Sequence, residues 1–194
     1  MRRLPLAVLA IAAGLALAGC VPEPAPSGSP TVPVPTGPAT SDPTPKPPAP
    51  EPTETPQPAE PVSIPCETLA TPEAVYAFNP NFGGIGPWTP DAGTPAAEAV
   101  SLGGTACRWV NQTSGAPLDV SVAHPGTARL AELRAEAAAG SPAGFGDESF
   151  SATVGGSGRV TTFQDGFWIV VSSPYIGQAS DAEPIVTSAL AALP

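Results

Sequence analysis

The sequence predicts an α+β domain: an antiparallel sheet of about five strands, with helices packed on one face and one disulfide. Three observations in residues 63–194 support this fold class. They are helix-start signals at three places, five segments with strand-like patterns, and a pair of cysteines. Glycine-containing turns separate the last three strand segments, and strands joined by such short turns pair antiparallel.

The first helix is predicted between residues 71 and 78. Thr71 is a favourable N-cap, Pro72 suits the first helical position, and Glu73 places a negative charge near the positive end of the helix dipole. The helix should end before Pro80, because the residue that precedes a proline is restricted to extended conformations.

Two further helices are predicted in the second half of the domain. Thr127 caps the first of them, which should end at Gly140 and bury one apolar face. Ser180 and Glu183 form a capping-box pattern at the start of the last helix. Apolar residues follow this box at helical spacing and should dock the helix on the sheet: Ile185, Val186, Ala189 and Leu190.

Five segments carry strand signals: residues 105–110, 118–123, 148–154, 159–163 and 167–172. The second of them alternates apolar and polar residues, which is the period of a half-buried strand. The last is apolar on both faces, so it should be central in the sheet. Residues 79–104 are rich in glycine and proline, and we expect them to be irregular apart from one helical turn near residues 95–100.

Residues 1–19 have the pattern of a lipoprotein signal peptide. Arg2 and Arg3 precede an apolar run that is shorter than the roughly 20 residues of a membrane-spanning helix. The run ends in Leu-Ala-Gly-Cys, which closely resembles the lipobox of bacterial lipoproteins. That resemblance implies cleavage before Cys20 and attachment of acyl chains such as palmitate to Cys20, which would anchor the protein at the extracytoplasmic face of the cell membrane. The alternative is an ordinary signal peptide with a chance cysteine.

The cysteine count agrees with export. Three cysteines are present, and lipidation of Cys20 leaves the pair Cys66 and Cys107. Because exported domains keep disulfides, we predict a Cys66–Cys107 bridge. Two buried free thiols are the alternative.

Residues 20–62 are predicted to be the lipidated cysteine and a disordered tether. Residues 21–62 hold 16 prolines and no aromatic residue, so they cannot bury enough apolar surface to fold. Proline density favours extended polyproline II conformation, which suits a spacer. A proline motif that a partner recognises is the rival interpretation. The extracytoplasmic domain is predicted to span residues 63–194, which contain every tryptophan, tyrosine and phenylalanine.

The negative net charge of the chain limits the kinds of molecule that the protein can bind. The formal net charge is −10, and removal of residues 1–19 takes two arginines away and moves it to −12. Nucleic-acid binding requires a basic surface, so it is excluded, and electrostatic adhesion to anionic lipid is disfavoured. The expected partners are the membrane, through the anchor on Cys20, and an envelope protein or a small-molecule ligand.

Three stretches of residues 63–194 carry a family resemblance. Cys66 precedes a helix, Cys107-Arg108-Trp109 lies on a strand, and the segment Gly144–Phe150 leads into a later strand. This arrangement is similar to a family of small actinobacterial lipoproteins of unknown function and, more distantly, to the extracellular sensor domains of some actinobacterial receptor kinases. The resemblance implies an extracytoplasmic α+β domain with a Cys66–Cys107 bridge and no catalytic residues. The long glycine-proline loop before Cys107 departs from the family pattern.

No catalytic residue, metal ligand or cofactor site is predicted. His124 is the single histidine, in a His-Pro-Gly turn without an orienting partner. Asp147 and Glu148 are adjacent on a strand, so they should point to opposite faces. The single lysine, Lys46, lies in the tether.

Trp88 and Phe82 are the candidate contacts for a ligand or partner. Both lie in the irregular stretch, and an aromatic residue on a loop is a common binding contact. The alternative is that Trp88 folds back as a plug over the sheet. We therefore expect a non-catalytic binding or interaction domain, with a cell-wall hydrolase or transferase and a purely structural envelope protein as alternatives.

Overall fold

Residues 56–194 are the part of the chain that the computed structural model describes. The predicted signal peptide, Cys20 and most of the predicted tether lie outside these described residues. Within residues 56–194 no helix is both long enough and apolar enough to cross a membrane.

A single antiparallel sheet organises the domain, with strand order β1-β2-β3-β7-β6-β5-β4. The strands are β1 (Phe82–Gly84), β2 (Thr105–Asn111), β3 (Pro117–Ala123), β4 (Ser141–Pro142), β5 (Glu148–Val154), β6 (Ser157–Gln164) and β7 (Phe167–Ser173). The α+β class is confirmed, and seven strands replace the five that were predicted. The two additional strands, β1 and β4, are edge strands of three and two residues, too short to carry a periodic pattern.

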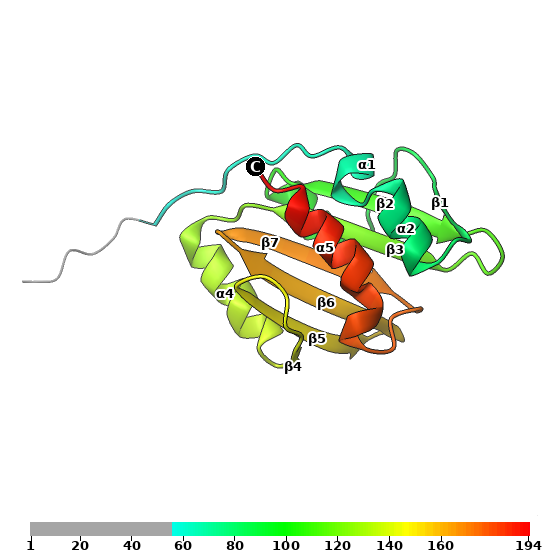
Figure 1. Ribbon diagram of the computed structural model, residues 1–194. Helices are drawn as coiled ribbons and strands as arrows, with labels where there is room; N and C mark the ends of the chain where they lie inside the picture. Colours follow the sequence, from blue (N-terminus) through cyan, green and yellow to red (C-terminus); the bar gives the residue numbers. More distant parts are fainter. Residues whose placement is uncertain (1–55) are drawn as a thin grey trace, which may run out of the picture. The chain divides into compact units, whose positions relative to one another are not determined.

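Five α-helices and one 3₁₀ helix accompany the sheet. They are α1 (Cys66–Leu69), α2 (Pro72–Phe78), α3 (Pro95–Ser101), α4 (Thr127–Ala137), the 3₁₀ helix η1 (Ala179–Ala182) and α5 (Glu183–Ala191). Helix α5 crosses one face of the sheet, with α1 and α2 beside it (Figure 1).

The prediction that helices cover one face is wrong, because both faces are covered. On β7, Ile169 and Val171 pack in a cluster with residues of α1, α2 and α5, whereas Trp168 and Val170 pack in a second cluster with residues of α3 and α4. Alternate residues of a strand point to opposite faces, so these two clusters lie on opposite sides of the sheet. The cause is the sequence of β7, which is apolar at consecutive positions and needs cover on both sides.

The predicted disulfide between Cys66 and Cys107 is present. It joins the first residue of α1 to the middle of β2, with the two Cα atoms 5.6 Å apart and a sequence separation of 41. A loop of that length corresponds to about 4 kcal/mol of stabilisation in the chain-entropy model. The bridge therefore fastens the α1–α2 layer to the sheet beside β1.

The chain enters the domain along an extended run. Gln57 exchanges hydrogen bonds with Thr127, and Glu60 bridges to His124 at the end of β3. Further on, the amide of Ile64 donates to the Thr105 hydroxyl at the start of β2. The last residues of the proline-rich segment are thus hydrogen bonded to the domain.

Helix caps follow the sequence at one of the three predicted positions. The Thr71 hydroxyl accepts a hydrogen bond from the Ala74 amide, as expected for the N-cap of α2. Thr127 is the first residue of α4 rather than its cap, since the cap position belongs to Gly126 and makes no side-chain hydrogen bond. The predicted Ser180–Glu183 box is also wrong, because the capping box forms between Gln178 and Asp181 at the start of η1.

Candidate functional site

A groove of about 810 Å³ lies beside strand β2, at the edge of the sheet. Its lining comes from α1, α2, β2 and the segment around β1. Most of the side chains are apolar or aromatic, among them Val75, Tyr76, Phe82, Trp88 and Trp109. The structure thus brings the two predicted contact residues, Trp88 and Phe82, into the lining of one groove.

Phe82 forms the fixed wall of this groove. It lies on β1 and is buried, with 8% of its surface exposed. Its ring is tilted against Phe78 of α2 at 5.4 Å and meets Tyr175 edge-on at 5.5 Å between centroids. Aromatic pairs at such distances hold each other in place, so Phe82 is a rigid surface against which a ligand would rest.

Trp88 forms the opposite wall from an exposed loop. Gly86 has φ +75°, the left-handed conformation that favours glycine, and this turn precedes Pro87 and Trp88. The Trp88 ring lies over the Arg108 guanidinium, 3.9 Å from ring centroid to Cζ. Trp88 is half-buried, so part of the indole remains open to solvent.

Arg108 is fixed from below by Asp119. Its Nε donates to Asp119 Oδ1 at 2.6 Å, and its second terminal nitrogen donates to Oδ2 at 2.7 Å. The two residues are directly opposite on β2 and β3. The hydrogen bond to Asp119 is the main cause of the raised pKa of Arg108, which is therefore always charged. Trp88 therefore stacks on a guanidinium group whose position is fixed by two hydrogen bonds.

An uncovered strand edge lies at the floor of the groove. Strand β1 pairs with β2 only at Trp109–Asn111, although β2 begins at Thr105. The Asn111 amide donates to Ala116 of the β3 side, and the Gln112 amide donates to Asn81 of the β1 side. Main-chain groups alternate between the two sides of a strand, so Ala106 and Arg108 direct theirs away from β3. The last β1 pair, Gly84 with Trp109, adjoins Arg108, and within residues 56–194 no strand pairs with Ala106 on this side.

The polar side chains of the groove suit contact rather than bond-breaking chemistry. Glu67, Tyr76 and Arg108 are its charged or hydroxylated members, and Arg108 is already engaged. Cys66 lies there too, in the disulfide. Among residues 56–194 no cluster of histidine, cysteine, aspartate or glutamate side chains could hold a metal ion.

The other residues considered from sequence lie outside the groove. His124 meets Phe167 edge-on at 4.8 Å, at the end of β3. The Asp147 carboxylate accepts a hydrogen bond from the Asp165 amide, in the turn between β6 and β7. Glu148 lies 3.7 Å from Arg134 of α4.

Sequence reasoning missed Arg108 and Asp119 as parts of the site. Each occupies a polar position in an alternating strand, and the two face each other once the strands pair. That alternation was a usable signal, because opposite charges at cross-strand positions stabilise a sheet. The uncovered edge at Ala106 had no signal, since it depends on where the short strand β1 stops.

Comparison of the chain with protein-family models, with curated proteins and with solved structures found no match.

Proposed function

We propose that the protein is a membrane-anchored envelope lipoprotein whose domain binds an extended segment of a partner polypeptide, without catalysis. In this proposal Cys20 carries the lipid anchor, the proline-rich segment is the tether, and the groove beside β2 is the binding site. The partner segment lies along β2 as an additional strand, and its side chains rest between Phe82 and Trp88.

The observation that carries the proposal is the strand edge at Ala106, which lies beyond the last β1 pair and lines an aromatic groove. Unpaired N–H and C=O groups at a strand edge are a template for another extended chain. In strand addition, main-chain hydrogen bonds supply affinity, and flanking pockets select the side chains. Here the two features coincide, because Ala106 and Arg108 line the same groove as Phe82 and Trp88.

A polypeptide fits this groove better than a compact ligand does. The edge of β2 continues past the last β1 pair toward Thr105, and most of the side chains that line the groove beside it are apolar or aromatic. The lining also contains aromatic residues, which line grooves that bind extended peptides, together with Pro72, Pro80 and Pro87. A cell-wall hydrolase or transferase remains the alternative function.

Amide hydrogen exchange on the full-length chain tests the proposal. In the free protein the amides of Ala106 and Arg108 should exchange much faster than those of Cys107 and Trp109, which are bonded to β3. Random decapeptides displayed on phage serve as the probe, selected on the immobilised full-length chain. Selected peptides should protect the Ala106 and Arg108 amides on binding.

Two variants test whether the selected peptides bind in the groove beside β2. Trp88→Ala should weaken their binding by about tenfold or more, because one wall of the groove is lost. Val154→Ala removes exposed apolar surface on β5, outside the groove, and should leave binding unchanged. Failure to select any peptide, or binding without protection of Ala106 and Arg108, would overturn the proposal.

A further inference from the structure

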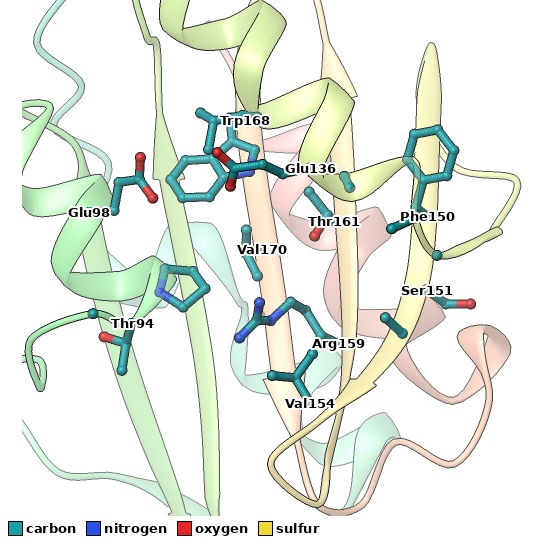
Figure 2. Close-up of a pocket in the computed structure, with 17 residues that line it drawn as sticks. Thr94, Glu98, Glu136, Phe150, Ser151, Val154, Arg159, Thr161, Trp168 and Val170 are labelled. Atoms are coloured by element: carbon teal, nitrogen blue, oxygen red, sulfur yellow. The ribbon is translucent and has the colours of Figure 1, made fainter. Parts of the chain in front are cut away.

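A second cavity lies on the face of the sheet that α3 and α4 cover, between these two helices (Figure 2). Its volume is about 340 Å³, close to that of a small metabolite rather than a protein segment. Its floor is formed by strands β5, β6 and β7, including Thr161, Trp168 and Val170. Pro95 and Glu98 of α3 form one wall, and Leu133 and Glu136 of α4 belong to the other.

Arg159 of β6 enters this cavity without a counter-ion. Within residues 56–194 the other three arginines each lie within 4.0 Å of a carboxylate, and Arg159 does not. Its Nε atom is buried and makes no hydrogen bond. Burial lowers the pKa of the guanidinium, and no neighbouring charge opposes that change. A buried cation without a counter-ion is costly, so Arg159 is a candidate for binding an anionic group.

Arg159 also lines a neighbouring hollow, together with serine residues and Asp119. A smaller hollow of about 120 Å³ continues from the cavity along the sheet and shares Arg159 with it. Ser121, Ser157 and Ser172 line this hollow. The nearest carboxylate along the row of strands is Asp119, opposite Ser172, and it is taken by Arg108. A carboxylate bound here would receive the guanidinium fork and serine hydroxyls together.

The opposite end of the cavity carries negative charge. Glu98 and Glu136 both hydrogen bond to Arg129, which also binds Glu132. Three glutamate carboxylates therefore share the single positive charge of Arg129, which leaves a net negative charge at this end of the cavity. Figure 2 shows Arg159 at one end of the cavity, Glu98 and Glu136 toward the other end near Trp168, and Val170 between them. A ligand with only negative groups would be repelled at this second end.

We infer that this cavity binds a small zwitterion of the amino-acid class, with its carboxylate on Arg159 and its ammonium group toward Glu98 and Glu136. The apolar part of the ligand lies over Val170 and Trp168. This site is separate from the groove beside β2, because the two share no lining residue.

Calorimetric titration of the full-length chain with each of the twenty L-amino acids tests the inference. At least one amino acid should bind about tenfold or more tightly than acetate, which has the carboxylate alone, and than its own amide, which lacks it. Arg159→Gln should abolish that binding, and Arg159→Lys should retain part of it, because lysine keeps the charge without the fork. Arg134→Gln, an arginine outside the cavity, should bind as the natural chain does.

The melting temperature distinguishes between two roles of Arg159, namely ligand binding and stabilisation of the fold. Arg159→Met keeps most of the apolar stem and removes the unpaired charge, so without ligand it should raise the melting temperature. A lower melting temperature would mean that Arg159 stabilises the fold and would overturn the inference. Absence of binding by every amino acid, or binding that survives Arg159→Gln, would overturn it equally.

Discussion

Trp88 illustrates how one residue can be positioned by a neighbour rather than by burial. Its ring is half-buried over the Arg108 guanidinium, and Arg108 is held by two hydrogen bonds to Asp119. A cation beneath an indole contributes about 0.5–1 kcal/mol at an exposed site, much less than burial of the whole ring would. The geometry therefore supports the contact interpretation of Trp88 over the plug interpretation.

Trp88→Ala should lower the free energy of unfolding by about 1–2 kcal/mol, because the contact with Arg108 and the partly buried surface of the indole are both lost. Trp168→Ala should cost about 3–5 kcal/mol, since that side chain fills the core under α3 and α4. Urea denaturation of both variants measures the difference. A loss for Trp88→Ala as large as that for Trp168→Ala would show that Trp88 is a structural plug.

At the scale of an element, the turn before α5 depends on one carboxylate. Asp181 Oδ2 accepts hydrogen bonds from the amides of Gly177 and Gln178, at 2.9 and 3.0 Å. These bonds lower the pKa of Asp181 below its ordinary value of 3.8, with the Gln178 amide as the largest cause. The capping box thus joins the end of β7 to the helix that covers the sheet.

Asp181→Asn should destabilise the domain at neutral pH, because the amide side chain accepts these hydrogen bonds less strongly than a carboxylate does. Asp181 has a lower pKa in the folded chain than in the unfolded chain, so its contribution is complete above pH 3.8 and is lost as pH falls through the folded value. Urea denaturation at several pH values should show the natural chain and the variant converging in acid. Ser180→Ala, in the same turn, should show no such convergence, and a constant gap for Asp181→Asn would contradict the prediction.

The elements differ in how far the sequence predicts them. Strands β2, β3, β5, β6 and β7 were predicted because each is long enough to show a period of two or a continuous apolar run. Strand β1 has three residues and two are glycine, so only its pairing with Trp109–Asn111 makes it a strand. The capping box at η1 uses Gln178, a residue that is not a preferred cap, and tertiary packing decided the position.

The sequence predicted the aromatic residues of the site but not the way in which the fold arranges them. Trp88 and Phe82 could be singled out because large aromatic side chains in a glycine-rich loop are unusual. The groove itself requires the disulfide, the end of β1 and the Arg108–Asp119 pair together. Arg159 was not singled out, because only the folded chain reveals that no carboxylate reaches it.

For the whole molecule, the proposed anchor makes a prediction about location. Cys20→Ser should move the full-length protein from the membrane fraction to the soluble fraction and abolish incorporation of labelled fatty acid, because the acyl acceptor is gone. The double variant Cys66→Ser and Cys107→Ser removes the disulfide and should still incorporate the label. Label that remains on Cys20→Ser would rule out Cys20 as the acceptor.

The route by which the chain enters the domain has a mechanical consequence. If the chain is anchored at Cys20 as proposed, a force on that end would first detach residues 57–64 from Thr127, His124 and Thr105, one hydrogen bond after another. At Cys66 the load would pass through the covalent bridge to Cys107, in a strand bonded to β3 along its length. A strand that is pulled along its axis separates only when many hydrogen bonds break together. We therefore expect residues 57–64 to detach at low force and the sheet to unfold only at a higher force.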